Sequence, residues 1–147
     1  MQEVSLQERY MQEALKQAQL AAQQDEVPIG AIVVCNGKII ARAHNLTEAL
    51  TDPTAHAEMQ AITIATSYLG GKYLNECELY VTVEPCPMCA AALNWAQVKK
   101  VVYGASDKKR GYSLFSPSLL HPKTIVEKGV LEEQCSSIVT EFFRNKR

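Results

Sequence analysis

The chain has 147 residues, of which 47% are hydrophobic and 21% charged, and its formal net charge is −1. This length and composition are typical of a globular protein, and we expect a single domain over residues 1–147. The balanced charge excludes a globally basic protein, so attraction to nucleic acid would need a local cluster of lysines and arginines. We find neither an apolar run long enough to span a bilayer nor a signal-peptide pattern, and we expect a cytoplasmic protein without a membrane segment.

The first half of the chain predicts a helix followed by a β-hairpin. The helix covers residues 5–24, where Ser5 and Glu8 form a capping box. Strands over 31–35 and 38–43 are joined by an Asn-Gly pair, which favours a two-residue hairpin turn. The apolar residues at helical spacing in the first helix, expected to be buried, are Leu6, Tyr10, Ala14, Ala18 and Ala21.

The second half alternates strands and helices, which favours a sheet covered on both faces. Helices are predicted over 55–69, 86–96 and 130–144, and strands over 77–83, 100–103 and 124–127. The connection over 105–123 is long for a compact domain, and such loops are often functional. We therefore expect a three-layer α/β/α fold with a five-stranded mixed sheet that opens with an antiparallel hairpin.

The five cysteines are an odd number without the spacing of a disulfide framework, which argues against a secreted disulfide-rich protein. Cys35, Cys77 and Cys135 lie in apolar patterns and are predicted to be small buried residues. Cys86 and Cys89 open a predicted helix, where the helix dipole favours thiolate. Their spacing alone fits a redox dithiol, half of a structural metal site or a catalytic metal site equally well.

His56 and Glu58 favour the catalytic metal site. They fall in the first turn of the predicted helix 55–69, and this helix start and that of the cysteines both follow strand ends, where α/β sheets form their ligand crevice. His56, Cys86 and Cys89 would be three zinc ligands that leave a fourth position open, as in catalytic zinc sites. Residues two apart on a helix point about 200° from each other, so this helix would have to present its end to the site.

The predicted chemistry is hydrolytic. A zinc ion lowers the pKa of a bound water to about 7, which gives hydroxide at neutral pH. The hydroxide would attack an amidine-like carbon of a base. Glu58 would take the water proton, deliver it to a ring nitrogen and help the amine leave as ammonia.

Several segments resemble bacterial tRNA-specific adenosine deaminases, which belong to the cytidine-deaminase-like superfamily. The pattern His56-Ala57-Glu58 followed by Pro85-Cys86-Pro87-Met88-Cys89 is shared across these zinc deaminases. Asp52-Pro53-Thr54 and the basic tail are closer to the tRNA enzymes. The resemblance covers nearly the whole chain and implies one zinc ion per subunit, a homodimer, and conversion of the wobble adenosine of a tRNA anticodon stem-loop to inosine.

The resemblance also implies roles for single residues. Asn45 would hydrogen-bond the base, Val27 and Pro28 would line its pocket, and Asp107 would lie near the ribose of the target nucleotide. The segment after Asp107 departs from the small-residue run of many members. Its added bulk and charge suit RNA, on which Tyr112 could stack, or a dimer interface. The resemblance implies phosphate contacts by Arg144, Lys146 and Arg147, and the bulk and charge of the divergent segment add Lys108, Lys109, Arg110 and Tyr112 as candidate RNA contacts.

Three other functions fit part of the pattern. A zinc-dependent deaminase of a free base or nucleoside, such as guanine, would use the same metal site. A thiol redox protein would use only Cys86 and Cys89. A non-catalytic RNA-binding module stabilised by zinc would have no need of Glu58 beside His56.

Overall fold

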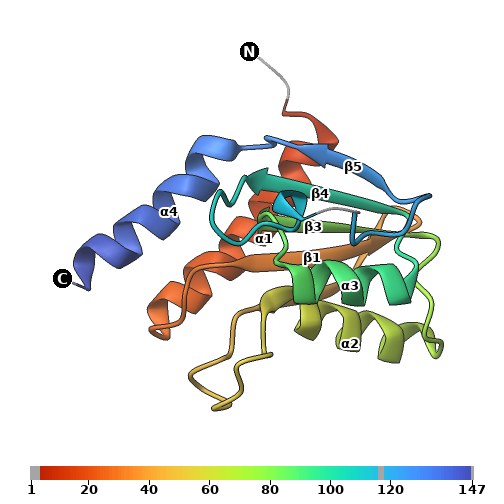
Figure 1. Cartoon of the computed structure of the whole chain (residues 1–147), viewed down its shortest axis with the longest axis horizontal. Coiled ribbons are helices and arrows are strands. Elements are labelled where there is room, and N and C mark those ends of the chain that lie inside the picture. Colours follow the sequence, from red (N-terminus) through yellow and green to blue (C-terminus); the bar gives the residue numbers. More distant parts are fainter. Residues whose placement is uncertain (1–3, 116–117, 147) are drawn as a thin grey trace.

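The computed structural model describes residues 4–115 and 118–146. It contains a five-stranded mixed sheet and four α-helices, which confirms the predicted fold class (Figure 1). In chain order the elements are α1 (Leu6–Gln23), β1 (Gly30–Cys35), β2 (Lys38–His44), α2 (Ala57–Leu69), β3 (Cys77–Val83), α3 (Pro87–Ala96), β4 (Lys100–Ala105), the 3-10 turn η1 (Tyr112–Leu114), β5 (Ile125–Lys128) and α4 (Glu132–Asn145).

The strand order in the sheet is β2-β1-β3-β4-β5. β1 pairs antiparallel with both β2 and β3, whereas β3 pairs parallel with β4 and β4 with β5. The sheet thus opens with the predicted hairpin. Because β2 and β3 are both antiparallel to β1, they run in the same direction and end at the same edge. The connections to α2 and α3 begin at that edge.

Helices cover both faces of the sheet, with α2 and α3 on one side and α1 and α4 on the other (Figure 1). Alternating residues of each strand point to opposite faces. Val33 and Leu79 belong to the core under α2 and α3. Ile32 and Tyr80 belong to the core under α1 and α4. No helix in the described part of the chain is long and apolar enough to cross a membrane.

Helix α1 begins with the predicted capping box, in which the side chains of Ser5 and Glu8 each accept from the other residue's backbone N–H. The predicted buried stripe was wrong at Leu6, which is 63% exposed, and it omitted Met11, which is fully buried. The helix packs very closely on the start of β1. A Cβ added at Gly30 would lie 2.0 Å from the Ala14 carbonyl oxygen, so only glycine fits there.

Candidate metal and active site

Two helix starts position the candidate metal ligands. His56 is the N-cap of α2 and Cys86 the N-cap of α3, and both have extended backbones. The sequence placed both residues inside the first turns, and the structure shifts them just ahead of the helices. A residue at an N-cap does not follow the helical repeat of side-chain directions. His56 and Glu58 can therefore reach one site although they are only two residues apart, because α2 presents its end to it.

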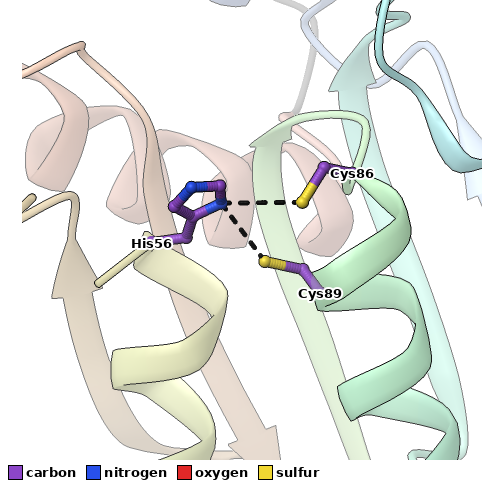
Figure 2. Close-up of side chains that lie close together, drawn as sticks. All are labelled: His56, Cys86 and Cys89. Carbon is purple, nitrogen blue, oxygen red and sulfur yellow. Dashed lines mark hydrogen bonds between the residues drawn. The ribbon is translucent and has the colours of Figure 1, made fainter. Parts of the chain in front are cut away.

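His56, Cys86 and Cys89 point toward one another (Figure 2). The Nδ1 atom of His56 lies 3.6 Å from the Cys86 Sγ and 3.5 Å from the Cys89 Sγ. A tetrahedral zinc ion with ordinary bond lengths of about 2.3 Å to sulfur and 2.05 Å to nitrogen separates these two ligand types by about 3.6 Å. Both sulfur atoms therefore already stand at the separation from the His56 Nδ1 atom that zinc requires, all three donor atoms lie within 4.8 Å of one another, and the donor set suits zinc chemically.

The pKa values of the two thiols are shifted in opposite directions. Hydrogen bonds that the Cys86 sulfur accepts from Cys89 and from His56 lower the pKa of Cys86 to about 4. Hydrogen bonding to Cys86, together with burial, raises the pKa of Cys89 above its usual range. Hydrogen bonding with Cys86 also raises the pKa of His56. Because metal ligands must be deprotonated, binding a cation here would release protons from this cluster.

Glu58 lies beside the three ligands as a buried carboxyl group. Its side chain is within hydrogen-bonding reach of Cys89, and the residue is only 4% exposed. Burial raises the pKa of Glu58 to about 7, because the ionised form loses its hydration. A carboxyl group with a pKa near neutrality is suited to both take up and release a proton.

The candidate metal site opens into a pocket of about 920 Å³. Several residues that the sequence singled out line it, and they come from elements far apart in the chain: Val27, Asn45, His56, Glu58, Cys86, Asp107, Lys109, Arg110 and Lys146. Val139 and Phe143 of α4 close one side. Pro28 is buried next to Val27 and is not among the lining residues.

Asn45 links the pocket to the start of α2. Its Oδ1 atom accepts a hydrogen bond of 2.8 Å from the backbone N–H of Ala57, and the residue is 6% exposed. This bond satisfies one of the free N–H groups at the helix start. It also fixes the orientation of the amide, and the Nδ2 donor has no hydrogen-bond partner among the described residues. Asn45 can therefore offer a hydrogen-bond donor to a molecule in the pocket.

The structure divides the predicted RNA contacts. Lys109 and Arg110 line the pocket; so does Lys146, which pairs with Asp25. Lys108 and Arg144 are exposed outside the lining, and Arg147 lies outside the described residues.

Tyr112 requires a correction. It is only 7% exposed and packs edge-to-face on Tyr103 in the core, at 6.4 Å between ring centroids. The ring is therefore not available to stack on a base. Tyr112 is apolar enough to fill the core beneath α3, and this packing was not visible in the loop sequence.

Two buried carboxylates that hold loops at the pocket were not singled out from the sequence. Glu26 accepts three hydrogen bonds from residues 47–49, and Glu84 accepts three from the 106–115 loop. Each of these loops contributes to the pocket. The sequence does carry a signal for them, because each is an acidic residue next to apolar residues and a proline. Carboxylates in such buried segments usually have partners.

The sheet, its crevice and the His-Cys-Cys group define the class, a cytidine-deaminase-like α/β protein with a zinc site. In agreement, residues 4–105 match the model of the family described as the cytidine and deoxycytidylate deaminase zinc-binding region. A tRNA-specific adenosine deaminase from Bacillus subtilis is 49% identical over 145 residues, which cover 95% of this chain and 90% of the relative. The chain belongs to the tRNA-specific adenosine deaminase family.

Two solved structures extend the comparison. One comes from a study of A-to-I editing by tRNA:A34 deaminases at the wobble position of transfer RNA. It is 41% identical, with a TM-score of 0.83, and the match covers 88% of this chain and 98% of that one. The other is a guanine deaminase from Bacillus subtilis, 40% identical with a TM-score of 0.65, where the match covers 67% of this chain and 64% of that one.

Proposed function

We propose that the protein hydrolyses the wobble adenosine of a tRNA anticodon to inosine and ammonia. The observation that carries this proposal is the pocket itself. It is lined by Glu58, by the metal ligands His56 and Cys86, and by the cationic residues Lys109, Arg110 and Lys146. Cationic side chains in the pocket lining suit a base that is delivered on a phosphate backbone. The match over most of the chain to relatives that carry the tRNA deaminase name supports the same substrate. Such a substrate would place the protein in the cytoplasm.

The residues of the chain divide the chemistry among them. His56, Cys86 and Cys89 would hold the zinc ion, which when bound supplies a Lewis acid that acidifies the attacking water. Glu58 takes the proton from that water and passes it to the ring nitrogen beside the attacked carbon, and then assists the departure of ammonia. Asn45 holds the base through its Nδ2 donor.

The alternatives are less well supported by the same site. The guanine deaminase matches a smaller part of this chain, and a free base has no phosphates for the three cationic residues of the pocket lining to bind. A redox dithiol needs a reactive thiolate with an accessible partner, whereas Cys89 is fully buried.

One assay tests the proposed substrate. The zinc-loaded protein is incubated separately with an anticodon stem-loop RNA, free adenosine, guanine and cytosine, and ammonia and inosine are measured. We expect turnover of the stem-loop alone. Release of ammonia from guanine without any from RNA would replace the proposal with a free-base deaminase.

Variants of Asn45 should separate its two roles. Asn45→Asp keeps an oxygen that accepts from Ala57 but loses the donor toward the base. We expect near wild-type thermal stability and at least about 10-fold lower kcat/KM, from the loss of one or more hydrogen bonds to the substrate. Asn45→Ala should lose activity and, in addition, about 1 kcal/mol of stability, the usual value of an N-terminal helix cap. Full activity of Asn45→Asp would contradict the contact with the base.

We further propose that the protein is a homodimer that uses the face carrying α2 and α3. Large apolar side chains are exposed on both helices, with Tyr68 at 56% and Trp95 at 84%. Exposed apolar patches of this kind are typical of protein interfaces.

Light scattering should give about twice the chain mass of 16.3 kDa for the wild type and the monomer mass for Trp95→Glu. Leu20→Glu on α1 makes the matched control and should remain dimeric.

A further inference from the structure

Glu84 is a buried carboxylate beside the site that the hydrolytic chemistry does not use. It follows β3 directly and is 5% exposed. Its Oε1 atom accepts a hydrogen bond of 3.1 Å from the backbone N–H of Asp107. Its Oε2 atom accepts from the backbone N–H of Ser113 at 3.0 Å and from the Ser113 hydroxyl at 2.7 Å. One side chain thus holds both ends of the 107–113 turn.

The turn carries two of the three cations that line the pocket. Asp107 organises its middle, because its Oδ1 atom accepts hydrogen bonds of 3.0 Å from the backbone N–H groups of Lys109 and Arg110. Asp107 is in turn held by Glu84 through its own N–H. The positions of both cationic side chains at the pocket therefore depend on the Glu84 carboxylate.

The surrounding packing is shaped around this carboxylate. A Cβ added at Gly111 would lie 2.3 Å from the Glu84 Oε2 atom, so the turn approaches Glu84 as closely as only glycine allows. The next residue, Tyr112, donates from its N–H to the Pro85 carbonyl at 2.9 Å. Its buried ring then anchors the end of the turn in the core. The turn is thus tied to the same segment that delivers Cys86.

We propose that Glu84 is a positioning residue for RNA binding, which holds the 107–113 turn so that Lys109 and Arg110 meet the phosphates of the substrate. The inference rests on the proposed RNA substrate. A turn that is ordered before binding loses less conformational entropy when it meets its ligand. Both oxygens of Glu84 are already occupied by donors of the turn, so it acts on substrate binding and not on the reacting atoms.

Glu84→Gln tests this role, because the amide points a donor at groups that are themselves donors. We expect KM for the anticodon stem-loop to rise about 10-fold, with kcat and zinc content unchanged. The slope of log K for RNA binding against log salt concentration should become shallower by about 1.4. Two phosphate contacts are lost, and each contributes about 0.7 to this slope on single-stranded nucleic acid. Backbone amides of 106–115 should exchange faster with deuterium.

Two further variants separate positioning from simple destabilisation. Glu26→Gln is the matched control: Glu26 is fully buried, accepts three hydrogen bonds and holds residues 47–49, which contain no lysine or arginine. It should lose comparable stability and keep the wild-type salt dependence. In a Lys109→Ala/Arg110→Ala background, Glu84→Gln should raise KM no further, because the groups through which it acts are gone.

The outcomes are distinct. An undiminished increase in KM in the Lys109→Ala/Arg110→Ala background would overturn the positioning role, as would unchanged amide exchange over 106–115 in Glu84→Gln. If the wild type fails to deaminate the stem-loop, the proposed function falls. The role of Glu84 can then still be tested without turnover, by the salt dependence of binding to the same RNA and by amide exchange in the turn.

Discussion

Glu58→Ala should abolish turnover while the protein keeps about one zinc ion per chain. We expect kcat to fall by about 10³-fold or more. A positioned group that transfers one proton typically contributes about 10²–10⁴-fold, and Glu58 serves more than one transfer. Glu58 is not one of the three grouped ligands, so its loss leaves the donor set intact. Elemental analysis for zinc and inosine formation from the stem-loop measure the two effects separately.

Stability provides the control for this variant. Burial raises the pKa of Glu58 to about 7, so the ionised carboxylate is costly to the fold near neutral pH. Glu58→Gln preserves the shape of the side chain and removes that cost. We therefore expect its Tm at pH 7 to equal or exceed that of the wild type, although turnover is lost. A zinc-loaded Glu58→Gln protein with near wild-type turnover would disprove the proton-transfer role.

Cys89→Ala should remove the zinc ion and all measurable turnover. The sulfur lies 3.5 Å from the His56 Nδ1 atom, at the separation that two ligands of one ion require. With only His56 and Cys86 left, we expect dialysed protein to retain less than about a tenth of the wild-type zinc. Tm should also fall, because a ligand that binds only the folded state stabilises it by about 4 kcal/mol at 1,000 times its Kd.

Cys135→Ala is the matched control for this variant. Cys135 is also fully buried, but it lies in the core under α1 and α4, against Gly104 and away from the metal ligands. Cys135→Ala should lower the free energy of unfolding only slightly, because one small core side chain is truncated. It should keep both zinc and turnover. Removing zinc from the wild type with a chelator should reproduce the Cys89→Ala result, and adding zinc should reverse it. Turnover by the zinc-free wild type would rule out the metal mechanism.

Local patterns predicted the elements well because local physics sets them. The capping box of Ser5 and Glu8 was confirmed, since it depends on hydrogen bonds and dihedral angles within a few residues. Packing was less predictable. Leu6 is exposed and Met11 buried, because the side of a helix that meets the sheet depends on where the strands lie.

The sequence by itself determined the type of chemistry. Histidine, glutamate and two cysteines, each at the start of a predicted helix that follows a strand, pointed to a zinc site with an acid–base group. Chain order alone also predicted that the two helix starts would share a crevice, because strands that run in the same direction end at the same edge. The substrate rested on resemblance, since the cations that bear on it lie in loops without a periodic pattern.

Tertiary structure decided how the residues are arranged at that crevice. It placed His56 and Cys86 at N-caps and set the ligand separations that fit zinc. It also took Tyr112 into the core and gave Glu84 its hold on the cationic turn. The ligand separations and the hydrogen bonds of Glu84 depend on contacts between segments more than 20 residues apart. Such contacts arise only when the sheet is assembled, so no local pattern could have specified them.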